Sequence, residues 1–536
     1  MTVSRRALFL SGAAAVLGGA ALFAVRRLDR AGLKVESNGF YTRLPIPRLI
    51  DAREVGNTIE LTAKSDITQF LPNLDAESYG YSAPYLGPVI RVYRGDSVKM
   101  SVSNHLDNST TVHWHGLFVP SQFDGGPYNS IAPGQTWQPI LDIDQAAATT
   151  WFHPQLHRDA GRQTYMGLAG LLYVEDGSAA DLGLPSRYGL DDLPLVLQDR
   201  AFGPDGELVY DNSPATMMQG YRGDTIIVNG AIGPVAEVPK GLVRLRLLNA
   251  ANARNFHLTF DDSRLMYVIA TDNGYVPTPV GVRELTIAPG ERFEILVDFS
   301  DGAVSSILTY PDHLKQPLSG MPELFNEVIH QVTDVLTPVI RFDPVDTIPI
   351  RAKDPPSKLV DRPVLRMQAV GNQRSFILDS MAAINDPILK GAVEMPIFRE
   401  QGVVQGGDQS QLAGIDRRGK PVGAASSIRM GINGSEFDIS RLDATVRVGD
   451  QEIWEITGTG MAHPFHIHGA SFHVLQLDGA PAPEHLAGSK DTVLVNEQAL
   501  LLVNFTQKAD PSMPFVFHCS ILEHQDAGMM AQYTAV

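Results

Sequence analysis

Two stretches near opposite ends of the chain share one pattern of apolar and polar residues. Residues 89–102 alternate apolar and polar side chains on both sides of a central Gly-Asp turn, and residues 444–456 repeat the pattern around a second Gly-Asp turn. Alternation with a period of two predicts β-strands that bury one face. A histidine pair follows each copy at nearly the same offset, at His113 and at His466. The pattern therefore predicts an internal repeat.

Strand-like runs also occur in the middle of the chain, at 226–230, 243–249 and 285–292, without a histidine pair. A Pro- and charge-rich stretch at 346–363 is typical of a linker. We therefore predict an all-β protein with three β-sandwich domains, the outer two carrying the chemistry. The expected boundaries are 45–180 for the first domain, 190–345 for the second and 362–536 for the third.

Composition narrows the functional class. The 536 residues carry a formal net charge of −17, which disfavours nucleic acid and anionic membranes as partners. Gly (48) and Pro (36) are frequent, as expected of turn-rich β-structure. A single cysteine excludes an internal disulfide. We expect a monomer.

The N-terminal 30 residues predict export. Arg5-Arg6 precede a run without charges from Ala7 to Val25, which is the pattern of a twin-Arg (Tat) export signal. The run is also just long enough to act as an uncleaved membrane anchor. We expect a periplasmic protein that uses the Tat export machinery, with retention by the N-terminus as the alternative.

The only cysteine, Cys519, lies in the most informative segment. His524 follows it by five residues and Met529 by ten. Thiolate, imidazole and a weak axial thioether are the ligands of a blue (type 1) copper site. Zinc is the rival metal, but zinc sites rarely combine one Cys with a Met. A second imidazole is needed, and the segment 463–468 can supply it.

Strand geometry divides the histidines into groups. Alternate residues of a strand face the same side, so His113 projects with His115, and His466 with His468. Two such pairs would gather four imidazoles between the outer domains. Cys519 faces one side of its strand, while His518 faces the other. One copper could therefore bind in front of the strand and another behind it, joined by a covalent path for electrons.

Four segments resemble signatures of the multicopper oxidases, and most of all of the bacterial periplasmic copper-efflux oxidases. The family patterns HWHG, W-x-H-x-H, H-P-x-H-x-H and H-C-H-x3-H-x4-M match residues 113–116, 151–155, 463–468 and 518–529. The likeness runs from Gly87 to the C-terminus. It implies cupredoxin-like Greek-key domains and three kinds of copper position. Carried over by position, the type 1 ligands are His463, Cys519, His524 and Met529; the type 2 ligands are His113 and His466; and the type 3 ligands are His115, His153, His468 and His518.

The same likeness identifies departures. Gln155 and Ser520 stand where the family has two further type 3 histidines, and Gln525 replaces an acidic residue. Asp124 matches a family acid that helps to move protons. The implied activity is oxidation of phenolic or metal-ion donors by single electrons, with transfer through Cys519 and His518 to O2. A copper electron-transfer protein with an impaired cluster, and a non-catalytic relative of the cell-division type, are the alternatives.

Overall fold

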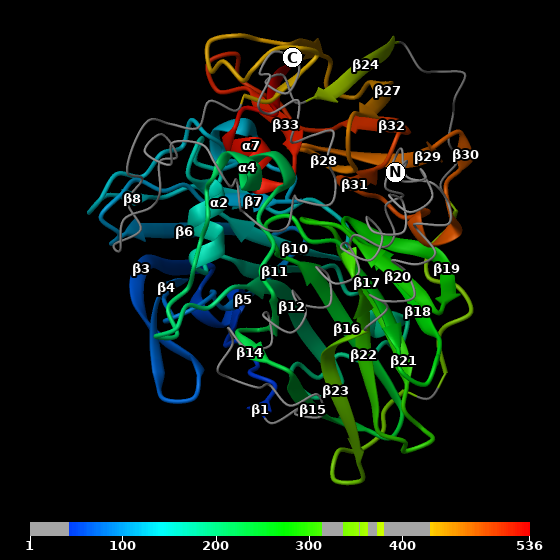
Figure 1. Cartoon of the computed structure of the whole chain (residues 1–536). Coiled ribbons are helices and arrows are strands. Elements are labelled where there is room, and N and C mark those ends of the chain that lie inside the picture. The colour runs from blue at the N-terminus through cyan, green and yellow to red at the C-terminus, as the bar shows by residue number, and fades with distance from the viewer. Residues whose placement is uncertain (1–41, 313–335, 353, 363–371, 380–428) are drawn as a thin grey trace, which may run out of the picture. The chain divides into compact units, whose positions relative to one another are not determined.

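The computed structural model describes residues 42–312, 336–352, 354–362, 372–379 and 429–536. Thr42–Val536 form one compact unit that consists mainly of β-strands, so the predicted all-β class is confirmed (Figure 1). The predicted export signal at 1–30 lies outside the described residues. Among the described residues, none of the helices has the length and apolar character required to cross a bilayer.

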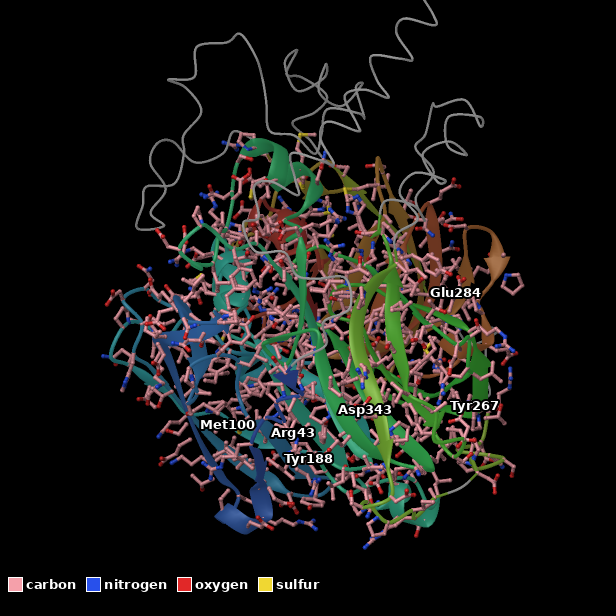
Figure 2. All side chains as sticks on the ribbon, turned by 60° about the horizontal axis from the view of Figure 1, so that its bottom comes forward. Arg43, Met100, Tyr188, Tyr267, Glu284 and Asp343 are labelled. Atoms are coloured by element: carbon pink, nitrogen blue, oxygen red, sulfur yellow. The ribbon has the colours of Figure 1, made fainter. Side chains whose placement is uncertain are left out.

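The N-terminal residues form two five-stranded sheets. One sheet has the order β2 (Leu49–Asp51), β5 (Val89–Tyr93), β11 (Gly170–Glu175), β10 (Ala148–His153), β7 (His113–His115). The other has the order β4 (Leu74–Tyr81), β3 (Thr58–Leu71), β6 (Ser97–Asn104), β8 (Thr136–Trp137), with β9 (Ile140–Asp142) also paired to β6. The apolar sides of both sheets bury a common core. Met100 of β6, which Figure 2 labels, belongs to this core.

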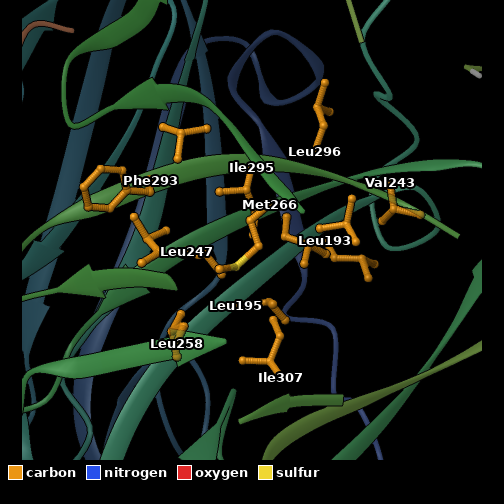
Figure 3. Close-up of a cluster of buried hydrophobic side chains, with 14 of the residues drawn as sticks. Leu193, Leu195, Val243, Leu247, Leu258, Met266, Phe293, Ile295, Leu296 and Ile307 are labelled. Atoms are coloured by element: carbon orange, nitrogen blue, oxygen red, sulfur yellow. The ribbon is translucent and has the colours of Figure 1, made fainter. Parts of the chain in front are cut away.

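The middle residues form a six-stranded and a seven-stranded sheet. The first has the order β1 (Thr42–Arg43), β15 (Pro234–Pro239), β23 (Thr337–Val345), β22 (Ser305–Tyr310), β17 (Phe256–Phe260), β20 (Glu284–Ile287). The second has the order β14 (Ala231–Ile232), β13 (Thr225–Val228), β12 (Asp192–Arg200), β16 (Leu242–Asn249), β21 (Arg292–Asp298), β18 (Met266–Thr271), β19 (Gly274–Val282). Leucine, isoleucine and phenylalanine side chains from both sheets form the core in Figure 3.

The C-terminal residues form a six-stranded and a five-stranded sheet. The first has the order β25 (Gly431–Ile432), β24 (Asn372–Asp379), β27 (Gln451–Gly458), β32 (Gln498–Phe505), β29 (Ala470–Leu477), β30 (Ala480–Pro481). The second has the order β26 (Ala444–Val446), β34 (Met530–Ala535), β33 (Phe515–Cys519), β28 (His463–Ile467), β31 (Thr492–Val495). Trp454, fully buried, stands at the centre of their shared core.

Short helices connect the sheets: η1 (Ala52–Val55), η2 (Ser121–Phe123), α2 (Ala160–Met166), α3 (Ser178–Asp181), α4 (Pro214–Gln219), η8 (Glu484–Leu486) and α7 (Leu522–Asp526). The strands around both Gly-Asp turns are present, as β5–β6 and as β26–β27. β5 pairs with β11 in parallel and β26 pairs with β34 in parallel, so the two ends share this topology as well. The exact domain boundaries stay a prediction.

The repeat places histidine-bearing strands in equivalent positions. β7 lies antiparallel to β10, with His113 opposite His153. β28 lies antiparallel to β33, with His466 opposite His518. Residues directly opposite each other on such strands are in side-chain contact range, so each outer sandwich presents its own group of imidazoles.

Candidate metal centres

Three ligand-type side chains converge within the C-terminal sandwich. Cys519 Sγ lies 3.5 Å from His463 Nδ1 and 3.6 Å from His524 Nδ1, and the two imidazole nitrogens are 3.3 Å apart. His463 begins β28, Cys519 ends β33 and His524 belongs to α7. All three are buried. A single ion could contact all three atoms, and a thiolate with two imidazoles is a copper donor set.

Met529 lies beside this group. Its backbone carbonyl accepts a hydrogen bond from the N–H of Cys519 (3.2 Å), and its own N–H donates to the carbonyl of His524 (2.9 Å). The side chain is fully buried in the same core as Cys519. Met529 is therefore held next to Cys519 and His524 by these backbone hydrogen bonds.

Burial sets the charge state of this pocket. It lowers the pKa of His463 to about 4 and that of His524 well below its usual value, so both imidazoles are neutral at pH 7. Each Nε2 faces a backbone carbonyl, that of Thr459 or of Met218, at 3.1 Å. A carbonyl only accepts, so the proton sits on Nε2 and Nδ1 is bare toward Cys519. Burial raises the pKa of the Cys519 thiol, so a bound cation has to displace its proton.

Six further imidazoles form three facing pairs, joined by the following nitrogen–nitrogen distances: His113 Nε2 to His466 Nε2, 3.5 Å; His115 Nδ1 to His153 Nε2, 3.2 Å; and His468 Nε2 to His518 Nε2, 3.2 Å. These gaps suit an ion bonded to both nitrogens at about 2.0 Å, the length of a zinc–imidazole bond. The first pair holds the two residues predicted as type 2 ligands, and the other two pairs hold residues predicted as type 3 ligands; the copper types stay a prediction. The cluster takes three imidazoles from each outer sandwich.

The imidazoles of the cluster are buried and packed against one another. The rings of His113 and His468 stack at a centroid distance of 3.7 Å, and those of His115 and His466 at 3.6 Å. Burial lowers the pKa of His468 to about 3, and it also lowers that of His115. Burial has the same effect on His153, His466 and His518. Neutral imidazole is the form that binds copper or zinc.

Asp124 supports the cluster from behind. Its Oδ2 lies 2.7 Å from His468 Nδ1 and 3.3 Å from His113 Nδ1. Burial opposes ionisation, but the two imidazoles hold the pKa of Asp124 well below its usual range. The carboxylate thus orients two histidines through the nitrogens that face away from their partners. Its geometry is that of a positioning group rather than of a ligand.

Two of the three departures from the family pattern occupy equivalent places, at Gln155 and Ser520. Gln155 follows His153 by two residues, and Ser520 follows His518 by two. Both are buried, and among the described residues neither the Gln155 amide nor the Ser520 hydroxyl has a hydrogen-bond partner. Ser520 lines a small cavity with His115, His153 and His518. Unsatisfied buried polar groups are costly, so both are candidates for further, weak oxygen or nitrogen ligands.

The two centres stand back to back. Cys519 contacts His463 and His524 on one side of β33, while His518 contacts His468 on the other. The alternation expected from sequence is present, and adjacent residues join the centres. Figure 1 labels β28, β33 and α7, the elements that carry these residues.

Sequence reasoning missed part of the support. Asp491 lies 3.2 Å from His115 Nε2, and Thr492 Oγ1 lies 3.0 Å from the same atom. Arg292 in turn donates two hydrogen bonds to the carboxylate of Asp491. In the sequence, the positions of Asp491 and Arg292 do not distinguish them from charged residues on the surface. His157, which follows His153 by four residues, contacts Phe437 at a ring-centroid distance of 5.1 Å and belongs to none of the ligand groups among the described residues.

Family models described as multicopper oxidase match residues 63–179, 205–306 and 408–536. The chain belongs to the multicopper oxidase family. It is 39% identical to the solved bacterial laccase-like multicopper oxidase CueO from Ochrobactrum sp., with a TM-score of 0.79, over 92% of this chain and 100% of that one. The match to McoA multicopper oxidase from Aquifex aeolicus has 27% identity and a TM-score of 0.74, over 92% and 99% of the two chains.

Other relatives of this chain are named cell division proteins. Cell division protein FtsP of Xenorhabdus nematophila is 35% identical over 99% of this chain and 98% of its own. Cell division protein FtsP of Escherichia coli is 34% identical, with the same two coverages. The predicted family and its cupredoxin-like fold are confirmed, and the family implies copper. Membership alone does not distinguish an oxidase from a cell-division protein.

Proposed function

We propose that the protein is an exported copper-dependent oxidoreductase that takes single electrons from phenolic or metal-ion donors and passes them to O2. The observation that carries the proposal is the back-to-back arrangement around β33, where Cys519 belongs to one centre and His518 to the next. Copper, when bound, supplies one-electron redox chemistry that no side chain of the chain provides. The similarity to the Ochrobactrum laccase-like multicopper oxidase, which has oxidase activity toward lignin model compounds, supports this class.

The residues divide the work. His463, Cys519, His524 and Met529 would hold the copper that accepts electrons, and the Cys519–His518 peptide would carry them onward. The six imidazoles of the cluster would hold the copper at which O2 is reduced. Reduction of O2 to two waters consumes four electrons and four protons. Asp124 is an ionised carboxylate buried beside His113 and His468 and is placed to help move protons there.

A second candidate function is electron transfer with little O2 reduction. It is favoured by Gln155 and Ser520, because hard oxygen donors bind copper more weakly than imidazole does. The similarity to proteins named cell division protein FtsP favours a third role, in which the fold serves cell division. A complete set of type 1 residues argues for copper chemistry over a purely structural role.

Three measurements on one copper-loaded sample separate these functions. An oxidase binds copper in both centres, absorbs intensely in the visible and consumes O2 with a phenolic donor. An electron-transfer protein is blue but consumes O2 slowly. A protein that binds no copper would contradict both proposals and leave the cell-division role.

We also propose that residues 1–30 direct twin-Arg-dependent export to the periplasm. We propose further that the protein is a monomer and that its three domains have the boundaries given in the sequence analysis. The charged pair Arg5-Arg6 before an uncharged run supports export. Replacing both residues by lysine should retain the protein in the cytoplasm while preserving net charge. Undiminished export of that variant would contradict the assignment, and membrane fractionation of wild type separates a cleaved signal from an anchor.

A further inference from the structure

A buried ion network joins the middle sheets to the imidazole cluster. Arg292, at the start of β21, binds Asp491 with two hydrogen bonds, Nη1 to Oδ1 at 2.7 Å and Nη2 to Oδ2 at 2.5 Å. Both residues are fully buried. Asp272 also holds this pair in place. Its carboxylate accepts hydrogen bonds from the backbone N–H groups of Arg292 (2.8 Å), Asp491 (3.2 Å) and Thr492 (3.2 Å).

Arg292 has its remaining donors committed as well. They reach the backbone carbonyls of Thr149, Gly290 and Asp272 at 3.0–3.1 Å. The planar guanidinium is therefore held in one orientation, which lysine could not reproduce. Gly116, the last residue of the first histidine motif, makes room for it: a Cβ there would collide with the guanidinium, and its φ of +87° also favours glycine.

The network determines which imidazole nitrogens carry protons. The hydroxyl of Thr492 donates to Asp491 Oδ1 (2.7 Å), so toward His115 Nε2 (3.0 Å) and His466 Nδ1 (3.1 Å) it can only accept. Asp491 also only accepts, through Oδ1 from His115 (3.2 Å) and through its backbone carbonyl from His466 (2.9 Å). His115 must therefore be protonated on Nε2 and His466 on Nδ1.

These tautomers leave the metal-facing nitrogens bare. His115 Nδ1 faces His153, and His466 Nε2 faces His113. One residue, Asp491, thus prepares opposite nitrogens on two histidines of two different metal positions, through its carboxylate at His115 and through its backbone carbonyl at His466. We propose that Arg292 is a positioning residue of the cluster, which holds Asp491 so that His115 and His466 present Nδ1 and Nε2, respectively, to copper. The middle sheets, which supply no ligand, would in this way control copper loading.

The inference rests on the proposed copper function, so its test begins with the copper-free protein. Histidine labelled with ¹⁵N in the rings reports tautomers by NMR. We compare Arg292→Lys and Arg292→Gln with Arg246→Lys and Arg246→Gln. Arg246 is a matched control, equally buried and paired with Asp192 at 2.8 Å, in the neighbouring strand β16 of the same sheet. Copper per chain, the type 2 electron paramagnetic resonance signal and the type 1 visible band follow after loading.

The Arg292 variants should show mixed tautomers at His115 and His466, and the cluster's copper affinity should fall about 10- to 100-fold, the usual loss when a partner of a ligand is removed. Arg292→Lys should lose less than Arg292→Gln, the type 1 band should stay, and the Arg246 variants should match wild type. Unchanged tautomers and cluster copper in folded Arg292→Lys would overturn the inference. So would loss of folding in both Arg292 variants while both Arg246 variants fold, because the role would then be structural. Wild type with these tautomers but no bound copper would contradict the proposed function instead.

Discussion

The pocket of Cys519 and the cluster of six imidazoles differ in how they are built. The pocket takes all its ligand-type side chains from residues 463–529 of one sandwich. The cluster takes imidazoles from both outer sandwiches and is supported by Arg292 from the middle sheets. Every expected ligand is present in the pocket, whereas the cluster has Gln155 and Ser520 at two expected positions. The geometry of the pocket therefore depends on the packing of the C-terminal sandwich alone. The geometry of the cluster depends on how the N-terminal, middle and C-terminal sheets pack against one another.

Because the two centres are built separately, substitutions in one should have different effects from substitutions in the other. Changes in the pocket should affect electron entry and leave the cluster's copper in place. Changes in the cluster should affect O2 reduction and leave the colour in place. His518 and Cys519 are adjacent residues of β33, so a change in one centre could easily disturb the other. Independent effects at the two centres would therefore be strong support for separate sites.

The largest effect is expected from Cys519→Ser. The copper-loaded variant should lose the intense visible band completely, because that band requires a Cu(II)–thiolate bond. Copper in the cluster should be retained, since the Cys519 thiol faces His463 and His524, and the hydrogen bond between His518 Nδ1 and the Cys519 backbone carbonyl (2.9 Å) does not involve the thiol. Absorption spectra and copper per chain measure both quantities. A wild-type protein that binds copper without a thiolate band would show that the pocket is not a type 1 site.

A second large effect is expected from restoring the two absent imidazoles with Gln155→His and Ser520→His. Removing a residue that hydrogen-bonds to a metal ligand lowers metal affinity or activity about 10- to 100-fold. Two added ligands should therefore raise O2 uptake by at least about tenfold. Each single change should do less than the pair, since a two-metal site needs both metals held. The rate of type 1 reduction in single turnover should stay constant.

Equal O2 uptake by wild type and the double variant would give the opposite answer. Gln155 and Ser520 would then be adequate groups for the cluster, and the electron-transfer alternative would lose its support.

The sequence was sufficient for much of this arrangement. Strand alternation and the repeated Gly-Asp turn predicted β5–β6 and β26–β27, and the spacing of Cys519, His524 and Met529 predicted one pocket. These features are local, and a period of two or a fixed offset determines them. Asp491 and Arg292 could not be predicted, because they come together only when the middle and C-terminal sheets pack.

A smaller, pH-dependent effect distinguishes the pocket from the cluster in the copper-free protein. The pKa of His463 is lowered to about 4, whereas in the unfolded chain it is about 6.5. The unfolded state binds more protons between these values, so stability falls as pH drops from 6.5 to 4, by about 3 kcal/mol for this residue. His463→Gln should remove that part of the acid sensitivity in urea unfolding measured at pH 7 and pH 4.

The cluster should keep the larger share. His115, His153, His466, His468 and His518 also have lowered pKa values, so the His463→Gln protein should remain acid-sensitive. An identical loss of stability in wild type and variant would mean that the pKa of His463 is the same in the folded and the unfolded protein.

The smallest effect is expected from His157→Ala. His157 is close enough in sequence to Gln155 to be suspected of replacing the absent imidazole, but its ring packs on Phe437 and its Nε2 lies 3.3 Å from Arg158 Nε. Cluster copper should therefore change less than about twofold, and the free energy of unfolding should fall by about 1 kcal/mol or less. His153→Ala, four residues earlier, is the matched control and should release cluster copper, because His153 faces His115 at 3.2 Å. If His157→Ala released cluster copper to the same extent, the ring would have to turn inward on metal binding. The cluster would then have more imidazoles than the geometry indicates, and Gln155 would no longer be its weak point.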